Sequence, residues 1–467
     1  MESLERSCVI IGGGLAGMVA GRRLQQRGHR PLVLEKGRER GGDCNARISG
    51  GMVHIAWAAL DTDPDLLYER LVAETSGEIS LPLARSLSGA AGKFRSWLHE
   101  EGVETRQNSK STLPWDIVWP PRHSGSRGWL ESQPRRIARE LGPDLMMTAL
   151  YTRYLADGGA LSQGTRATAI RPATDGTGWL VTCEGRGAAE LQTRTVLVAD
   201  GGFQANSELL CRYVGPHADR CLLRAQPTGT GDGLRMLLSL RAKTVGLGRV
   251  YGHMLSATAL TDDNLWPYPA MDRLSLKGAL IDRQGKLIQH AETTGIGLVN
   301  LLASGRDPLG QTVVFDRDVW EQDGTDDPYG SPVPNPALAE RHGHLSVATD
   351  IGSLAGNLDM SPRLLAESID AHNHRPGSIQ IQSPPYYGAR IVPGITFTMG
   401  GPLIDSTCAV MSEVDGRIPG IYAAGSAAGG VHGGPRGGYV GGLGVAGTFG
   451  LIAGDSISDF LERSTAA

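Results

Sequence analysis

The chain has 467 residues, a net charge of −4 and 40% hydrophobic residues. This length is enough for two to four domains, and the mixed charge gives no basic footprint for nucleic acid. No run of about 18 residues is both apolar and uncharged, so we expect no membrane span and no signal peptide. The six cysteines contain no CxxC pair, which favours reduced thiols in a cytoplasmic protein and predicts no metal site.

A dinucleotide-binding unit is predicted at the start of the chain. It consists of an apolar strand, a glycine-rich turn, a helix and a second strand, at residues 7–11, 12–17, 18–27 and 31–34. The turn fits G-x-G-x-x-G, in which Gly12 makes the tight turn, Gly14 admits the pyrophosphate and Gly17 lets the helix pack closely. Glu35 follows the second strand, where it can accept a hydrogen bond from a ribose hydroxyl. This unit alone leaves FAD and NAD(P) open.

A second glycine-rich segment, residues 39–51, follows the ribose-binding position closely. It suggests a backbone that runs along an extended ligand until it reaches a ring. Simple NAD-binding enzymes do not need such a segment, so it favours FAD.

The remaining elements indicate an interrupted sheet. Residues 64–155 are expected to be mainly helical, and residues 165–171 and 179–183 to pair as strands. The buried strand within 195–203 would return the chain to the first sheet. Residues 207–380 have short strands and many turns, which indicates an inserted second domain. From residue 384 onward strands and glycine loops return, and the chain ends in an amphipathic helix over 448–462.

Motifs in one order along most of the chain resemble the fumarate reductase and succinate dehydrogenase flavoproteins. That group also holds 3-ketosteroid dehydrogenases and tricarballylate dehydrogenase. The motifs are the N-terminal fingerprint, Gly50-Gly51, residues 199–206, 230–233, 282–286, 384–401 and 418–425, and the final glycine loop into 449–454.

The resemblance implies an α/β fold in which a Rossmann-like FAD-binding domain carries an inserted α+β capping domain. The first FAD-binding part is expected at 1–206, with a helical insertion at about 60–155. A capping domain is expected at 207–380, and a second FAD-binding part at 381–467. The substrate would lie between cap and flavin, and hydride would pass between flavin N5 and a substrate carbon. The expected partners are a small carbonyl or carboxylate substrate and an external electron acceptor or donor.

The fingerprint and the resemblance together assign the FAD contacts to Gly12, Gly14, Leu15, Ala16, Gly17, Glu35, Lys36, Gly42, Asp43, Ser49, Gly50, Gly51, Ala167, Asp200, Gly201, Gly202, Asn206, Asp232, Gly425, Ser426, Gly441, Gly442 and Leu443. Some members attach FAD through a histidine early in the second glycine segment. Cys44 or Asn45 stands there, which excludes a histidyl link. A cysteinyl link is the alternative, and we expect FAD to bind without a covalent link.

Three positions depart from the fumarate reductase pattern. The proton-donor arginine has become Gly295, and a carboxylate-binding histidine has become Phe397, which cannot bind an anion. Tyr439 makes its loop resemble that of the ketosteroid and tricarballylate dehydrogenases; in the ketosteroid enzymes the corresponding tyrosine polarises a ketone oxygen. Arg436 matches the group's carboxylate-binding arginine. The alternatives are a tyrosine packed in the core and an arginine that props the glycine loop.

Three further residues are catalytic candidates. Tyr251 and His253 lie where the group has a substrate-contacting histidine, and His290 lies near the missing arginine, where an imidazole could supply a proton. Each could instead be ordinary structure. The residues expected to line the substrate cavity are Thr396, Phe397, Tyr387, His54, Trp57 and Gly442.

These observations predict an FAD-dependent dehydrogenase that desaturates a carbon pair alpha,beta to a ketone or carboxylate, with Tyr439 polarising the carbonyl. One alternative is an ene-reductase that draws electrons from an external donor. Another is a flavin-binding protein without catalysis.

Overall fold

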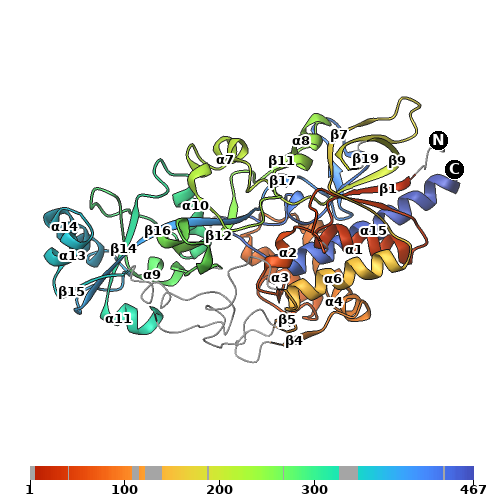
Figure 1. Cartoon of the computed structure of the whole chain (residues 1–467). Coiled ribbons are helices and arrows are strands. Elements are labelled where there is room, and N and C mark those ends of the chain that lie inside the picture. The colour runs from red at the N-terminus through yellow and green to blue at the C-terminus, as the bar shows by residue number, and fades with distance from the viewer. Residues whose placement is uncertain are drawn as a thin grey trace.

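The computed structural model describes residues 6–39, 41–107, 115–120, 139–186, 189–266, 268–324, 345–434 and 437–466. Two large sheets lie at opposite ends of an elongated molecule (Figure 1). Strand β1 (Arg6–Ile11) and the last helix, α15 (Leu443–Ala466), lie at one end. The long strand β16 (Tyr386–Thr398) runs from the other end toward the middle.

The first sheet has eight strands, in the order β18-β19-β9-β1-β2-β6, with β8 and then β7 attached through β9. Its further strands are β2 (Leu32–Glu35), β6 (Ala160–Gln163), β7 (Thr165–Pro172), β8 (Trp179–Gly185), β9 (Ala189–Val198), β18 (Ala409–Met411) and β19 (Arg417–Ala423). Val9 pairs in parallel with Leu32 and with Val196. The predicted fingerprint strands, and the return of the chain to the first sheet, are therefore confirmed.

Helices cover this sheet and share its core. Helix α1 (Leu15–Gln26) begins before the expected residue 18, and α15 begins before the expected residue 448. The two helices pack against each other, and α6 (Gly142–Ala156) packs against α1 (Figure 1). A Cβ on Gly450 would lie only 2.6 Å from the Ala16 carbonyl oxygen, so glycine permits this close approach.

The segment expected to be mainly helical also contains strands. Its helices include α3 (Pro64–Glu74) and α4 (Leu81–Glu100), which precede α6. Strands β4 (Thr105–Gln107) and β5 (Asp116–Val118) form a small antiparallel sheet with β3 (Met52–Val53), which lies outside the segment. Most of the described residues in the segment are helical, as expected. The two short strands were not expected, and they form because β5 pairs with β3 and β4 pairs with β5.

The second sheet has six strands built around β16. The other five are β10 (Leu222–Leu223), β12 (Val250–Ser256), β13 (Ala279–Ile281), β14 (Gln311–Asp316) and β15 (Ser346–Ala348). Strand β16 pairs in parallel with β10 and antiparallel with β12, β14 and β15. Residues 386–398, expected in the second FAD-binding part, thus hydrogen-bond within this sheet. The division of the chain into domains stays a prediction.

Helices also surround the second sheet. They are α7 (Ser207–Tyr213), α9 (Asp272–Lys277), α10 (Gly295–Ala303), α11 (Arg317–Val319), α13 (Ile351–Asn357) and α14 (Pro362–Asn373). Helix α8 (Asp232–Ser239) packs against β7 of the first sheet instead. A separate apolar core holds this part together. In it the rings of Phe315 and Tyr387 stack with centroids 5.4 Å apart, and Trp320 covers the same tyrosine.

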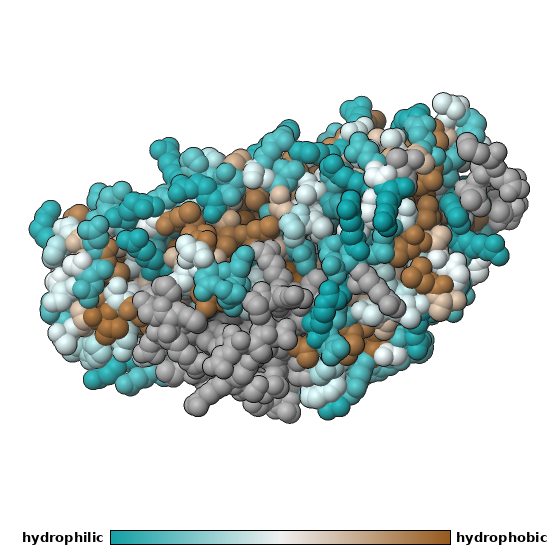
Figure 2. All heavy atoms as spheres, viewed as in Figure 1, coloured by the Kyte–Doolittle hydropathy of each residue, from teal (hydrophilic) through white to brown (hydrophobic). Residues whose placement is uncertain are grey.

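Among the residues that the structure describes, none of the helices is both long and apolar enough to span a bilayer. The face drawn in Figure 2 carries hydrophilic residues over most of its surface, with hydrophobic ones between them.

Candidate functional site

A large cavity lies where the carboxyl ends of β1, β2 and β9 meet β12 and β16. In open parallel sheets, ligands bind outside the carboxyl ends of the strands. The predicted cofactor residues that line it are Gly12, Gly14, Leu15, Ala16, Glu35, Lys36, Asp43, Ser49, Gly50, Gly51, Ala167, Asp200, Gly201, Gly202, Asp232, Gly425, Ser426, Gly442 and Leu443. The predicted substrate and catalytic residues that line it are Tyr251, His253, Thr396, Phe397 and Tyr439.

The glycine turn forms the end of the cavity that suits phosphates. Gly12 has φ of +104°, and a Cβ there would lie 2.5 Å from the Ala199 carbonyl oxygen. Gly14, at the N-cap of α1, supplies no capping side chain, so the first-turn N–H groups can face an anion. A Cβ on Gly17 would lie 2.0 Å from the Gly12 carbonyl oxygen. Gly17 does not line the cavity, and its lack of a side chain allows the first turn of α1 to pack against the glycine turn.

Tyr151 supports this turn and was missed by the sequence analysis. Its hydroxyl, carried by α6, donates to the Gly13 carbonyl oxygen at 2.8 Å. Added Cβ atoms on Gly13 and Gly42 would lie 2.1 and 2.6 Å from the same hydroxyl. Gly42 thus contacts the back of the turn rather than lining the cavity. The sequence offers little signal for this, since only tertiary packing brings α6 here.

Glu35 is buried at the end of β2 and holds two loops. Its Oε2 accepts from the Gly13 N–H at 2.8 Å, and its Oε1 accepts from the Gly37 N–H at 2.6 Å. Burial raises the pKa of the carboxyl, and these two hydrogen bonds only partly offset the rise. Each oxygen has a second lone pair, so a ribose hydroxyl can still donate to this residue.

Asp232 joins two cations at the adjoining wall. Its Oδ2 lies 2.9 Å from Lys36 Nζ, and its Oδ1 lies 2.5 Å from Arg166 Nη2. Burial alone would raise the pKa of Asp232, but the two cations outweigh burial and hold it below its usual range. Arg166 also lines the cavity, and the sequence analysis missed it beside the predicted Ala167.

Two buried acceptors on the lining test whether the cavity suits FAD. Asp200 Oδ1 and Gln204 Oε1 have no hydrogen-bond partner among the described residues, although the other oxygen of Asp200 accepts from the Gly233 N–H at 2.7 Å. Burial raises the pKa of Asp200 to about 6. Unsatisfied buried acceptors are costly, and FAD carries hydroxyl and ring N–H donors. The lining therefore fits the cofactor.

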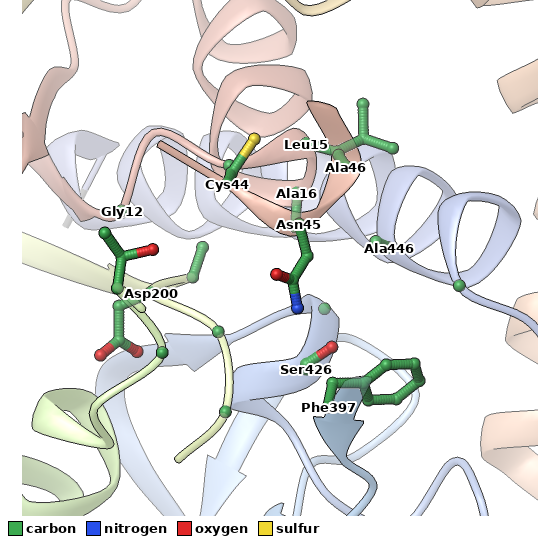
Figure 3. A pocket seen from close by; sticks show the side chains of 18 of the residues that line it. Gly12, Leu15, Ala16, Cys44, Asn45, Ala46, Asp200, Phe397, Ser426 and Ala446 are labelled. Atoms are coloured by element: carbon green, nitrogen blue, oxygen red, sulfur yellow. The ribbon is translucent and has the colours of Figure 1, made fainter. Parts of the chain in front are cut away.

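The second glycine segment closes the cavity against the second sheet. Asn45, which begins the short helix α2 (Asn45–Ile48), donates to the Thr396 carbonyl oxygen at 2.9 Å and accepts from the Gln226 N–H at 2.8 Å. Figure 3 shows the Asn45 amide directed toward Ser426 and Phe397. The sequence drew attention to Asn45 only because Cys44 or Asn45 stands where some members of the group carry the histidine that attaches FAD. Burial raises the pKa of neighbouring Cys44 to about 12, so its thiol stays neutral.

An aromatic cluster forms the wall that β12 and β16 share with the last glycine loop. Tyr251 and Tyr439 stack with ring centroids 4.0 Å apart, and Phe397 lies 5.2 Å from Tyr251. The two tyrosines are hydrogen-bonded, and burial together with Tyr251 raises the pKa of Tyr439 well above its usual range. A Cβ on Gly442 would lie 3.4 Å from the Tyr439 hydroxyl oxygen, so the backbone at residue 442 runs close to that hydroxyl.

His253 and Asp272 continue this hydroxyl pair. Tyr251 Oη lies 3.1 Å from His253 Nε2, and His253 Nδ1 lies 2.8 Å from Asp272 Oδ2. Asp272 begins α9, and its Oδ1 accepts from the Met254 N–H at 2.9 Å. Asp272 was not among the predicted residues, because only the packing of α9 against β12 brings it to His253.

His54 and Trp57 lie behind Tyr439 rather than on the cavity lining. Their rings stack at 4.7 Å, and Trp57 meets Tyr439 edge-on at 5.7 Å. Burial lowers the pKa of His54 to about 4, so its ring is neutral near pH 7. A Cβ on Gly441 would lie 2.5 Å from the His54 carbonyl oxygen, so this glycine permits the contact.

Four other predicted residues have different surroundings. His290 lies outside the lining, and its carbonyl oxygen accepts from Arg375 Nη2 at 2.5 Å. Tyr387 packs in the core of the second sheet. Asn206 caps α7 by accepting from the Leu209 N–H at 3.1 Å. Arg436 lies outside the described residues.

Comparison with known proteins agrees with this geometry. The site and fold define a flavoprotein of the dinucleotide-binding class. The chain belongs to the FAD binding domain family, which matches residues 7–441. It is an FAD-dependent oxidoreductase related to enzymes that act on carbon–carbon bonds, as the motifs predicted.

Three curated relatives are distant in sequence. The chain is 26% identical to the NADH:fumarate oxidoreductase of Klebsiella pneumoniae (strain 342), over 89% of this chain and 44% of that protein. It therefore spans less than half the length of that relative. It is 24% identical to the vinyl phenol reductase of Lactiplantibacillus plantarum, over 90% and 89% of the two chains. It is also 24% identical to the 4-oxocyclohexanecarboxylate 2-dehydrogenase of Sinomonas cyclohexanicum, over 96% and 92%.

Solved structures confirm the fold. The 3-ketosteroid delta1-dehydrogenase from Sterolibacterium denitrificans superposes with a TM-score of 0.73 at 17% identity, covering 97% of this chain and 99% of that one. The open form of a flavocytochrome c3 fumarate reductase gives 0.69 at 19% identity, covering 98% and 79%.

Proposed function

We propose that this protein is an FAD-dependent dehydrogenase that desaturates a carbon pair next to a ketone. The observation that carries the proposal is the Tyr439–Tyr251 hydroxyl pair on the cavity wall, backed by His253 and Asp272. Kinship with a 4-oxocyclohexanecarboxylate 2-dehydrogenase supports it, because that enzyme's name describes the same chemistry on a cyclic ketone.

The hydrogen bonds of this group run in one direction. A carboxylate accepts only, so His253 Nδ1 carries the proton that it shares with Asp272. In the neutral ring Nε2 is then an acceptor, and Tyr251 donates to it. The Tyr251 oxygen is left to accept from the Tyr439 hydroxyl. The chain of donors therefore runs from Tyr439 through Tyr251 and His253 to Asp272.

In the proposed mechanism Tyr439 turns its single O–H from the Tyr251 oxygen to the substrate carbonyl oxygen, which leaves the Tyr251 oxygen open to accept a proton. Its raised pKa keeps it protonated at neutral pH, which suits a donor. Polarising the carbonyl acidifies the neighbouring C–H, because the negative charge that develops on oxygen is stabilised. This contact contributes to the transition state more than to substrate binding.

The proton released from that carbon goes to the Tyr251 oxygen. Tyr251 at the same time passes its own proton to His253 Nε2, and the Asp272 carboxylate stabilises the imidazolium that forms. The electron pair of the broken C–H bond becomes the second bond between the two carbons. FAD, when bound, supplies the redox chemistry by accepting hydride from the other carbon. An external electron acceptor must then restore the oxidised cofactor.

The cofactor is proposed to bind without a covalent link, since the Cys44 thiol is held neutral and a neutral thiol is a poor nucleophile. The aromatic rings of Phe397 and Tyr251 offer a flat apolar surface to a cyclic substrate.

A second candidate is the reverse reaction, in which the same relay delivers a proton from Tyr251 to an alkene. The names of two relatives favour it, a vinyl phenol reductase and an NADH:fumarate oxidoreductase. The relay is compatible with both directions, so the electron partner and substrate decide between them.

The test is an anaerobic single-turnover experiment on the purified holoenzyme. Saturated cyclic ketones should bleach the oxidised flavin absorbance, whereas enones should restore it after chemical reduction. Comparing the two rates identifies the favoured direction. A colourless preparation that rejects added FAD would exclude both redox functions, and flavin that no ketone or enone changes would overturn the assignment of a carbonyl substrate.

A further inference from the structure

Arg224 places a positive charge on the wall of the substrate cavity. It follows β10, and its N–H donates to the Ile395 carbonyl oxygen at 2.8 Å, which fixes its backbone beside β16. Its Nη1 donates to Thr396 Oγ1 at 3.3 Å. Arg224 and Thr396 both line the cavity. The guanidinium is therefore held at the edge of the same wall that carries the aromatic cluster.

The charge of Arg224 belongs to the catalytic end of the cavity. Its guanidinium lies within the electrostatic reach of the Asp272 carboxylate. Burial lowers the pKa of Arg224, yet an arginine remains charged at any working pH. Asp272 is at the same time bound by His253 and by a backbone N–H. Arg166 and Lys36 pair with Asp232 on another wall of the cavity, which β2, β7 and α8 form.

Two further contacts shape the space next to Arg224. The guanidinium carbon lies 5.7 Å from the centre of the buried Trp266 ring, which also lines the cavity. Thr396 precedes Phe397, whose ring contacts Tyr251. A ligand that enters here meets flat apolar rings between a cationic group and a hydroxyl pair. An arginine fork at such a place suits a carboxylate, which it can bind through two N–H groups.

We infer that Arg224 is a specificity-determining residue that binds a carboxylate of the substrate, so that the substrate is an oxo carboxylic acid with an apolar body. This inference rests on the proposed function, since Tyr439 must hold the oxo group while Arg224 holds the acid. It names a substrate class that the hydroxyl pair alone does not select.

The first experiment measures binding and needs no turnover. The holoenzyme is titrated with cyclohexanecarboxylate and with cyclohexanecarboxamide, which has similar shape and no charge, and the perturbation of flavin absorbance gives each Kd. We expect the carboxylate to bind more tightly. Arg224→Met should weaken it at least about 30-fold, with little change for the amide. Arg224→Lys should keep part of the preference, because it keeps the charge and loses the fork.

Arg390→Met is the matched control, because Arg390 is exposed on β16 and is not among the residues lining the cavity. It should bind both compounds as the unchanged protein does. Equal affinity for acid and amide in the unchanged protein would overturn the inference, as would unchanged carboxylate affinity in Arg224→Met. Loss of FAD or a shifted flavin potential in both Arg224 variants would instead assign Arg224 to the cofactor, which also overturns it.

The second experiment separates this inference from the proposed function. An oxo acid and its neutral methyl ester are compared in the anaerobic flavin-bleaching assay. If Arg224→Met raises KM for the acid alone while kcat for the ester is unchanged, Arg224 acts on the acid group. If both ketones are turned over equally well by every variant, the inference fails and the proposed function stands. If carboxylate binding depends on Arg224 but no ketone is turned over, the binding site stands, while the ketone chemistry and the oxo acid class fail together.

Discussion

Tyr251 of β12 and Tyr439 of the last glycine loop stack with ring centroids 4.0 Å apart and share a hydrogen bond. The two residues lie 188 positions apart in the sequence. Behind them, His253 and Asp272 accept hydrogen bonds in turn, while His54 and Trp57 support Tyr439 from the other side. This contact joins β12 of the second sheet to the last glycine loop, and most of the predictions below concern it.

Tyr439→Phe should lower turnover of a ketone by about 10²- to 10³-fold, because it removes one donor to the developing oxyanion. FAD content should be unchanged. The measurement is the rate of flavin bleaching in stopped flow, with bound FAD counted by absorbance. Tyr387→Phe is the control, since Tyr387 packs in the second core away from the cavity. Equal loss in both variants would show that the effect is not specific to the cavity.

Asp272→Asn should reverse the direction of the hydrogen bonds. The amide N–H₂ donates, so His253 Nδ1 must accept and Nε2 must carry the proton, which leaves the Tyr251 hydroxyl without its acceptor. We expect kcat to fall about 10²-fold or more with little change in KM. The pH profile of kcat and its solvent isotope effect report the relay directly. If the variant is less stable but its pH profile of kcat has the same shape as that of the unchanged protein, then Asp272 only holds β12 against α9.

Gly17→Ala should weaken FAD binding and destabilise the fold by about 1–3 kcal/mol. The new Cβ would lie 2.0 Å from the Gly12 carbonyl oxygen, and backbone cannot yield cheaply there. Gly89→Ala is the matched control in α4, where a new Cβ meets nothing within 4 Å. It should stabilise by up to about 1 kcal/mol. Urea unfolding and FAD titration measure both variants, and equal FAD affinity would contradict the packing role of Gly17.

Acid should destabilise the region behind Tyr439 through His54. Burial lowers the pKa of His54 to about 4, whereas the unfolded chain protonates near 6.5. The folded state therefore binds fewer protons between these values, and its stability is fully present above pH 6.5 and falls as the pH drops toward 4. His54 is 1% exposed, so this group should cost about 2 kcal/mol between pH 7 and 5.

The check is urea unfolding at both pH values for the unchanged protein and for His54→Gln, whose amide can still accept from the Trp57 N–H. The variant should lose less stability on acidification. An identical pH dependence in the two proteins would rule out His54 as the titrating group.

The order of the elements was largely readable from the sequence, because neighbouring residues decide it. The glycine turn between two apolar strands predicted β1, α1 and β2, and the apolar run before residue 199 predicted the strand that pairs with β1. Gly12, Gly14 and Glu35, which were predicted to contact FAD for the same reason, line the cavity. Local periodicity and glycine spacing carry this information without reference to distant residues.

The arrangement of the catalytic end was decided only by the tertiary structure. The motif resemblance named Tyr439, Tyr251 and His253, but nothing local indicated that two of these rings would stack or that Asp272 would meet the third. Tyr387 was expected in the cavity, yet a strand sends alternate side chains to opposite faces, and this one packs in the core. Arg224 was overlooked because a single arginine has no pattern. Its place beside Thr396 depends on the pairing of β10 with β16, a contact that sequence neighbours cannot specify.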